Sequence, residues 1–264
     1  MSVDLGLHLT QKNPRQLMRV KNFRLAQLAW EYVTGCGQGC PECPIRAYAV
    51  RVPAKCLADT LKIEAQLERR LNISAPYLHS NRRQAPLETD PPGGILLPSA
   101  TRILTCWLGD LFAPAIAESW REDVLSVIRA CASRSLPWKF LIRTCHPEAL
   151  LHIDWPSNVE LGIYIWRRQQ LANVDDALKN LRRKYPTINR FLTVSPRAEL
   201  LDFTSLNDCS WLYVGDYPAN AVDPHDRPTL QQFTELSNQA KAEKCHLIPA
   251  PGLHFATPEE MPHD

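Results

Sequence analysis

The sequence predicts an α/β fold: a partial barrel with a largely parallel sheet. The chain has 264 residues, 45% hydrophobic and 22% charged, which is the balance of a globular protein with a substantial core. Apolar segments of strand length alternate with segments of helical period, which is typical of repeated βα units. Strand-like segments outnumber clear helices, and this favours an incomplete barrel over a closed eight-fold one.

Seven segments are predicted to be strands, because each is an apolar run of strand length. In chain order they are Leu28–Val33, Arg102–Trp107, Lys139–Arg143, Val159–Tyr164, Arg190–Val194, Trp211–Val214 and Cys245–Ile248.

Four helices are predicted between these strands. The clearest, Ala115–Ser133, repeats apolar residues at helical spacing and should bury one stripe. The others are Ala54–Leu71, Ala172–Lys184 and Thr229–Glu243.

The predicted barrel domain spans residues 28–248. Residues 1–27 form an N-terminal extension, and residues 249–264, rich in proline and charged at the end, form a C-terminal tail. Residues 72–99 interrupt the βα rhythm with polar, proline and glycine residues, so we expect an insertion there. No internal repeat is visible.

Charge and hydropathy restrict the function classes. A net charge of +2 gives no global attraction to nucleic acid or anionic lipid. Basic clusters such as Arg82-Arg83 and Arg182–Lys184 are interpreted as solvated helix faces or helix ends, so a nucleic-acid partner stays open without being indicated. The sequence has no apolar run of about 20 residues and no secretory signal, so we expect a cytoplasmic protein without a membrane partner.

A cysteine triplet carries the sharpest chemical signal. Cys36, Cys40 and Cys43 stand in C-x3-C-x2-C spacing directly after the first predicted strand, with glycines between them. Reduced thiolates are the ligands of iron–sulfur clusters, and glycines let the backbone turn tightly around one. Three ligands leave one iron open to a substrate or cofactor. Loops after barrel strands are also where active sites collect.

Zinc is the competing interpretation of the triplet. A closed zinc site needs four ligands, so a fourth would come from elsewhere in the chain, and structural zinc sites usually pair two C-x2-C units where this chain has one. The residues available as a fourth ligand are Cys56, His79, Cys106 and Cys145. A chain with no metal here is disfavoured, because three cysteines lie within eight residues.

The triplet on the loop after the first strand resembles the radical-SAM superfamily. More narrowly, the chain resembles a phage-associated, uncharacterised radical-SAM-like family that has a Trp…Thr-Gly-Cys lead, here Trp30 and Thr34-Gly35-Cys36. The resemblance extends in order from Trp30 to Ile248. Further matching stretches are Tyr48-Ala49, Asp110-Leu111-Phe112, Asn158–Gly162 and Arg190–Val194.

This resemblance implies a partial (β/α)6-type barrel with a 4Fe-4S cluster on Cys36, Cys40 and Cys43. It also implies that S-adenosylmethionine binds the open iron and is cleaved to a 5′-deoxyadenosyl radical, which acts on an unknown substrate. An electron donor such as a flavodoxin or ferredoxin would be a partner. The organic chemistry would belong to the cofactor, and the protein would supply orientation and exclusion of side reactions.

Several departures from the family pattern keep a second function open. Ser195-Pro196 replaces Glu-Pro, Gly215-Asp216 falls where the family has Gly-Gly-Glu, and Cys145-His146 replaces Lys-Arg. An acidic residue expected near Tyr164 is absent. The alternative is therefore a binding or interaction module, with a cluster or zinc in a structural role and a protein or nucleic-acid partner.

Two aspartates are candidate cofactor-binding residues, and no catalytic residue is assigned. Asp110 follows an apolar strand and a glycine, where it would accept a hydrogen bond from the S-adenosylmethionine ammonium; the alternative is an N-cap for the helix at Ala115. Asp216, at a later strand end, would bind a ribose; the alternative is a turn residue before Tyr217-Pro218.

Overall fold

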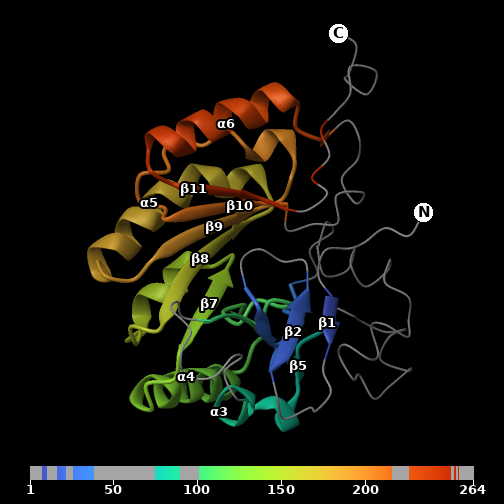
Figure 1. The fold of residues 1–264 in the computed structure, drawn as a ribbon, viewed down its shortest axis with the longest axis vertical. Helices are drawn as coiled ribbons and strands as arrows, with labels where there is room; N and C mark the ends of the chain where they lie inside the picture. Colours follow the sequence, from blue (N-terminus) through green and yellow to red (C-terminus); the bar gives the residue numbers. More distant parts are fainter. Residues whose placement is uncertain are drawn as a thin grey trace, which may run out of the picture. The chain divides into compact units, whose positions relative to one another are not determined.

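A computed structural model describes residues 8–10, 17–21, 26–38, 75–89, 101–215 and 226–250, together with Leu253 and Phe255 (Figure 1). The described chain divides into two compact units. The N-terminal unit takes its described residues from Leu7–His146 and Asp154–Glu160, and the C-terminal unit from Pro147–Ile153 and Leu161–Asp264. Each unit is an α/β structure built on parallel strands.

In the described part of the N-terminal unit, the larger group of paired strands has the order β1-β2-β3-β6-β7. The pairs β1/β2 and β2/β3 are antiparallel, whereas β3, β6 and β7 are parallel, with Ala29 opposite Leu104 and Ile103 opposite Phe140. The strands are β1 (His8–Thr10), β2 (Met18–Lys21), β3 (Leu28–Trp30), β6 (Thr101–Thr105) and β7 (Trp138–Thr144).

Among the described residues, the N-terminal unit also has a smaller antiparallel pair and three helical segments. The pair is β4 (Val33–Thr34) with β5 (Tyr77–Leu78), and the helical segments are the 3₁₀-helix η2 (Ser80–Arg82), α3 (Ala85–Glu88) and α4 (Glu118–Ser133). The apolar stripe predicted for the helix from Ala115 is confirmed in α4. Its buried residues are Val124, Leu125, Val127, Ile128 and Cys131.

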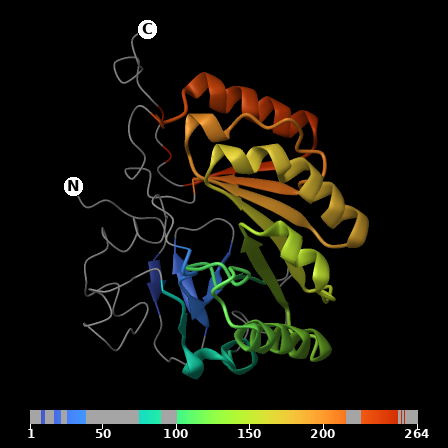
Figure 2. The ribbon, with the colours of Figure 1, turned by 180° about the vertical axis from the view of Figure 1, so that it is seen from behind.

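The C-terminal unit has parallel strands in the order β8-β9-β10-β11, and β8 begins in the N-terminal unit. Helices α5 and α6 lie on one side of these strands (Figures 1 and 2). This is expected when each strand is joined to the next strand in the sheet by a right-handed crossover, because such connections place their helices on the same face. The elements are β8 (Val159–Ile165), β9 (Arg190–Val194), β10 (Trp211–Val214), β11 (His246–Pro249), η3 (Pro147–His152), η4 (Ala198–Leu200), α5 (Arg168–Lys184) and α6 (Leu230–Ala242).

A glycine in β8 makes room for an aromatic pair in the core of the C-terminal unit. A Cβ atom on Gly162 would lie 2.2 Å from the Phe191 ring, which is fully buried. Phe191 stacks on Trp211 with ring centroids 4.0 Å apart. Gly162 therefore stands in the strand for packing, at the cost of weaker strand propensity.

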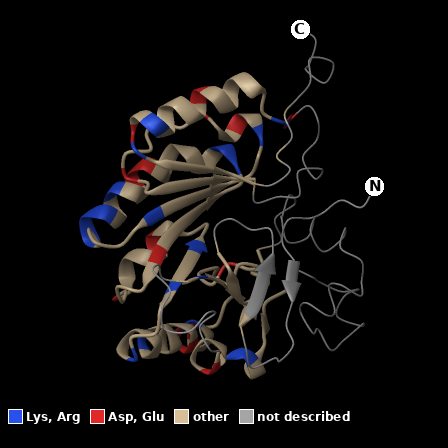
Figure 3. Cartoon of the chain, viewed as in Figure 1, with Lys and Arg blue, Asp and Glu red and all other residues tan. Residues whose placement is uncertain are grey.

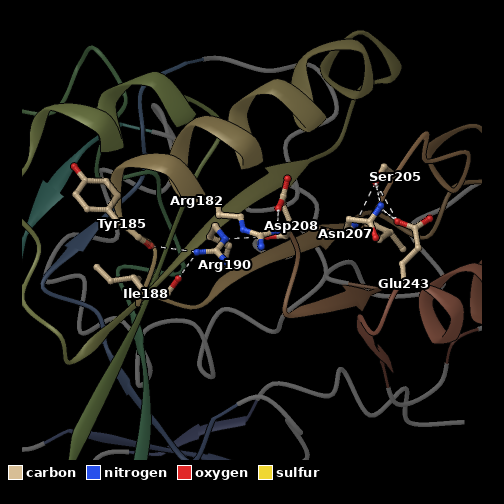
Figure 4. Close-up of polar contacts among 9 residues, drawn as sticks. Arg182, Tyr185, Ile188, Arg190, Ser205, Asn207, Asp208 and Glu243 are labelled. Atoms are coloured by element: carbon tan, nitrogen blue, oxygen red, sulfur yellow. Dashed lines mark hydrogen bonds and ion pairs between the residues drawn. The ribbon is translucent and has the colours of Figure 1, made fainter.

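Polar contacts hold the amino ends of β9 and β10 (Figure 4). Arg190, the first residue of β9, donates to the carbonyl oxygens of Asp208 (2.9 Å) and Ile188 (2.6 Å). Arg182 on α5 forms an ion pair with the Asp208 carboxylate at 2.5 Å. The Glu243 carboxylate accepts from the Ser205 hydroxyl at 3.1 Å. These contacts fix the segment that leads into β10.

Charged residues follow the pattern that the alternating sequence predicts. Figure 3 shows them along α4, α5 and α6, while most of the strand length in both units is uncharged. None of the described helices combines the length and the apolar composition that crossing a bilayer requires.

The predicted α/β class with a largely parallel sheet is confirmed, and the strands Arg190–Val194 and Trp211–Val214 have the predicted bounds. The predicted strand Leu28–Val33 is divided, because the chain leaves β3 at Trp30 and the Tyr32 carbonyl accepts from His79 N–H at 2.8 Å, which directs β4 toward β5. The predicted helix Ala54–Leu71 lies outside the described residues.

Helix starts were predicted less well than strands. The helix expected from Ala115 begins at Glu118, because Ala117 is still extended. The helix expected from Ala172 begins at Arg168, because Gln170 caps it through the backbone N–H of Arg167 at 2.9 Å. Strands β1 and β2 fall within the predicted N-terminal extension and were missed, since each has only three or four residues.

Candidate functional site

The candidate site lies at the carboxyl ends of β3, β6 and β7 in the N-terminal unit. Parallel strands bring the loops that follow them to the same edge. The three loops here carry Cys36, Asp110 and Cys145 respectively.

The first two loops touch through their backbones. Gly35 N–H donates to the Leu108 carbonyl at 2.8 Å, and Gly35 pairs with Gly109 as an isolated parallel bridge. A Cβ atom on Gly109 would lie 2.7 Å from Gly35 O, so a larger residue would separate the loops. Two glycines flank the buried Cys36, and both have left-handed φ angles, 71° at Gly35 and 69° at Gly37.

The other two members of the triplet, Cys40 and Cys43, lie outside the described residues. Among the residues that are described, no group of three or more His, Cys, Asp and Glu side chains gathers as a metal site would require. The cluster and zinc interpretations therefore both stay predictions.

Glu31 is the feature of this edge that our sequence reasoning missed. Its side chain is 1% exposed, and its two carboxylate oxygens accept from the backbone N–H groups of Trp107 and Leu108, each at 3.0 Å. Burial raises the pKa of the Glu31 carboxyl to about 7, although the two backbone bonds and the nearby Arg82 and Arg143 charges act in the opposite direction. The available signal was a carboxylate inside an otherwise apolar run.

Two arginines surround the Glu31 carboxylate. Arg82, on η2, is 1% exposed and donates to the Glu31 backbone carbonyl at 3.2 Å, and its own carbonyl accepts from Trp30 Nε1 at 2.8 Å. Arg143, near the end of β7, donates to the Trp107 carbonyl at 3.0 Å. Its guanidinium carbon lies 3.7 Å from the Trp107 ring centroid.

The interpretation of Arg82-Arg83 as a solvated helix face is wrong for Arg82. The chain buries Arg82, whereas its neighbour Arg83 is exposed and forms an ion pair with the half-buried Asp123 at 2.5 Å. Loss of hydration lowers the pKa of Arg82, with Glu31 acting against this effect. A basic doublet in the sequence does not reveal which member faces the core.

Asp110 joins the loop after β6 to the loop after β7. One carboxylate oxygen accepts from Phe112 N–H at 2.9 Å and the other from Cys145 N–H at 2.8 Å. Asp110 does not cap the following helix, whose N-cap is Ala117, so that alternative is wrong. Binding of an ammonium group by Asp110 stays a prediction.

The third loop also reaches the cysteine loop. The Gln38 side-chain amide hydrogen-bonds His146 Nε2, and His146 N–H donates to the Thr144 hydroxyl at 2.9 Å. His146 is therefore engaged by Gln38 of the cysteine loop.

A buried histidine holds the residue before Gly35. Thr34 Oγ1 and His79 Nε2 lie 3.1 Å apart, and the His79 ring meets Tyr77 edge-on. Burial, followed by the charge of Arg82, lowers the pKa of His79 to about 3, so the imidazole is neutral. His79, named above as a fourth zinc ligand, is thus paired with Thr34.

The C-terminal unit offers hydroxyl groups at the corresponding strand ends. Tyr164 and Ser195, at the ends of β8 and β9, are both buried, with their hydroxyl oxygens 3.5 Å apart. Asp216, the predicted ribose ligand, lies outside the described residues.

The parallel strands and the loops at their carboxyl ends define an α/β protein with a candidate site of the barrel type. The chain belongs to the family described as "Protein of unknown function (DUF5131)", whose model matches residues 22–245. No curated protein and no solved structure matches the chain.

Proposed function

We propose that the chain is an iron–sulfur, S-adenosylmethionine-dependent radical enzyme on a partial (β/α)6-type barrel. The observation that carries this proposal is the setting of Cys36: a buried thiol between two left-handed glycines, at the start of a C-x3-C-x2-C spacing, in the segment that follows the parallel strand β3 and the short strand β4.

The residues at this edge are suited to such a group. Cys36, Cys40 and Cys43 would hold the cluster, and the bound cluster would supply the electron that cleaves S-adenosylmethionine. Each oxygen of Asp110 accepts one backbone N–H bond, and an ionised carboxylate oxygen has capacity for a second donor, so Asp110 remains suited to an ammonium group. Asp216 is the proposed ribose ligand. The substrate is not specified, and a flavodoxin or ferredoxin would serve as electron donor.

A binding module is the second candidate function. It is favoured by the Tyr164–Ser195 pair, which places neutral hydroxyls where the resembling family has acidic residues. In this alternative the cluster or a zinc ion stabilises the fold, and the carboxyl edges of the strands recognise a protein or nucleic acid.

Anaerobic reconstitution with iron and sulfide, followed by electron paramagnetic resonance with and without S-adenosylmethionine, separates these functions. A four-iron signal that shifts with the cofactor supports the enzyme. A signal that ignores the cofactor supports the binding module. Tightly bound zinc without iron contradicts the proposed cluster.

Single variants test the ligand set. Cys36→Ala, Cys40→Ala and Cys43→Ala should each abolish the four-iron signal. Cys131→Ala is the matched control, because Cys131 is buried in α4, outside the triplet, and should leave the signal intact. Full iron and sulfide in all three triplet variants would exclude them as ligands.

A further inference from the structure

We propose that Glu31 is a positioning residue for Cys36: its carboxylate holds the backbone N–H groups of Trp107 and Leu108, and the Leu108 carbonyl in turn fixes Gly35. The inference rests on the proposed role of Cys36 as a cluster ligand.

The first step is a small anion-binding turn at the end of β6. Cys106 has φ 51°, a left-handed conformation that non-glycine residues rarely adopt. Immediately after it, the N–H groups of Trp107 and Leu108 both point at the Glu31 carboxylate. Successive N–H groups in such a turn form a concavity for an anion. In this protein the anion is a side chain from the neighbouring strand's end.

The second step is a restraint from the opposite side of the same peptides. Arg143 donates to the Trp107 carbonyl at 3.0 Å and stacks over its ring. Trp107 is therefore held at its N–H by Glu31, at its carbonyl by Arg143 and at its ring by the guanidinium. Because Trp107 and Glu31 are almost completely buried, water cannot readily replace these contacts.

The third step carries the position to the cysteine. Leu108, whose N–H is bound by Glu31, accepts from Gly35 N–H at 2.8 Å through its carbonyl. Gly109 then packs against Gly35 so closely that it has no room for a Cβ atom. Gly35 directly precedes Cys36 in the chain, so the residue that leads into Cys36 is fixed by the Glu31 clamp, the pair of hydrogen bonds from the Trp107 and Leu108 N–H groups to the Glu31 carboxylate.

A carboxylate is required for this role because both of its oxygens accept. Glutamine keeps the shape of the side chain, but its amide nitrogen would face one of the two N–H donors. Loss of a buried, charge-assisted hydrogen bond is expected to increase local opening of the turn by about tenfold or more. Glu160 provides the matched control. It is a buried glutamate of the same unit, its charged partner is Arg102 at 3.3 Å, and it stands at the amino end of β8.

The test compares Glu31→Gln with Glu160→Gln in the full chain. The first readout is the rate at which iodoacetamide alkylates Cys36 in metal-free, reduced protein, localised by peptide mass spectrometry. We expect Glu31→Gln to raise this rate about tenfold and Glu160→Gln to change it less than about twofold. The second readout is iron bound after reconstitution, which should fall in Glu31→Gln alone.

The outcomes distinguish this inference from the proposed function. Faster alkylation in Glu31→Gln with no iron in the wild type would retain the positioning role and reject the cluster. A second outcome would overturn the positioning role: the wild type binds iron, and Glu31→Gln has the same alkylation rate and the same iron content as the wild type. If Glu31→Gln does not fold, Glu31→Asp is tested in its place. Aspartate keeps the negative charge, but its side chain is one methylene shorter, so the carboxylate lies further from the two N–H groups. Its alkylation rate should lie above that of the wild type, and an unchanged rate would overturn the inference.

Discussion

Two sets of charged residues, one buried and one exposed, lie at opposite ends of the parallel strands of their respective units. In the N-terminal unit, Glu31 and Arg82 are each 1% exposed and lie beside the loops at the carboxyl ends. In the C-terminal unit, Arg182 and Asp208 pair near the amino ends of the strands, and the Arg182 side chain is 60% exposed. Carboxyl ends carry function in barrel proteins, whereas amino ends carry stability.

The difference shows that the consequence of losing a charged residue depends on its burial. An exposed pair typically contributes no more than about 1 kcal/mol, since water and salt screen it. A buried charge that loses its partner costs about 3–5 kcal/mol, because no water replaces the lost contact. Buried charged residues at one edge of a sheet therefore need a structural or functional reason, and the proposed positioning of Cys36 by Glu31 provides one.

The largest expected effect concerns the buried side of the comparison. Glu31→Ala leaves two buried N–H groups unsatisfied and removes the negative charge between Arg82 and Arg143. We expect the free energy of unfolding to fall by about 3 kcal/mol or more. Urea denaturation of the metal-free protein measures this, and a loss under about 1 kcal/mol would show that the clamp does not stabilise the fold.

A second prediction concerns packing in the C-terminal unit. Gly162→Ala places a methyl group within the Phe191 ring and should cost about 1–3 kcal/mol. The double variant Gly162→Ala/Phe191→Leu relieves the clash, so its loss should be smaller than the sum of the two single losses. Additive losses in urea denaturation would mean that the ring does not oppose the methyl group.

The third prediction is a dependence of stability on pH. The Glu31 pKa is raised from 4.5 to about 7, so the free energy of unfolding falls as pH rises through that range. The His79 pKa is lowered from 6.5 to about 3, so its contribution is present above 6.5 and is lost as pH falls. The two contributions oppose each other in the overlapping range. The charges facing these groups are Arg82 for both and Arg143 for Glu31.

Single variants separate the pH dependence of stability that comes from Glu31 from the part that comes from His79. Between about pH 5 and about pH 6.5, Glu31→Gln should gain stability as pH rises, because only the His79 contribution remains. His79→Gln should lose stability over the same range. Equal slopes for the two variants and the wild type, measured by urea denaturation, would exclude both groups as the source.

The smallest expected effect concerns the exposed side. Arg182→Ala should change the free energy of unfolding by no more than about 1 kcal/mol, and less at high salt. A loss as large as that of Glu31→Ala would remove the contrast between the two units.

The sequence predicted the strands well because their signal is local. Runs such as Phe191–Val194 and Trp211–Val214 are apolar over a strand length, and burial on both faces leaves little alternative. Gly162 was recognised as part of a strand, but its role as space for Phe191 depends on the neighbouring strand, which no local pattern encodes.

Of the candidate site, the cysteine triplet and Asp110 could be named from the sequence. C-x3-C-x2-C is a spacing and can be read directly, whereas the Glu31 clamp joins residues more than seventy positions apart. The Cys106 backbone was also beyond reach, because left-handed φ angles are expected at glycine rather than at an apolar strand end. Asp110 could be named as a residue after a strand, but its bond to Cys145 N–H depends on which strands are neighbours.

The backbone bonds between the loops have a consequence for hydrogen exchange. Amides in loops usually exchange with deuterium quickly, because they open without disturbing the sheet. The Gly35 N–H bound to Leu108 and the Cys145 N–H bound to Asp110 are in loops, yet each joins the ends of neighbouring strands. These two amides should exchange slowly, together with those of β3, β6 and β7, so that this edge opens with its sheet as a single cooperative element.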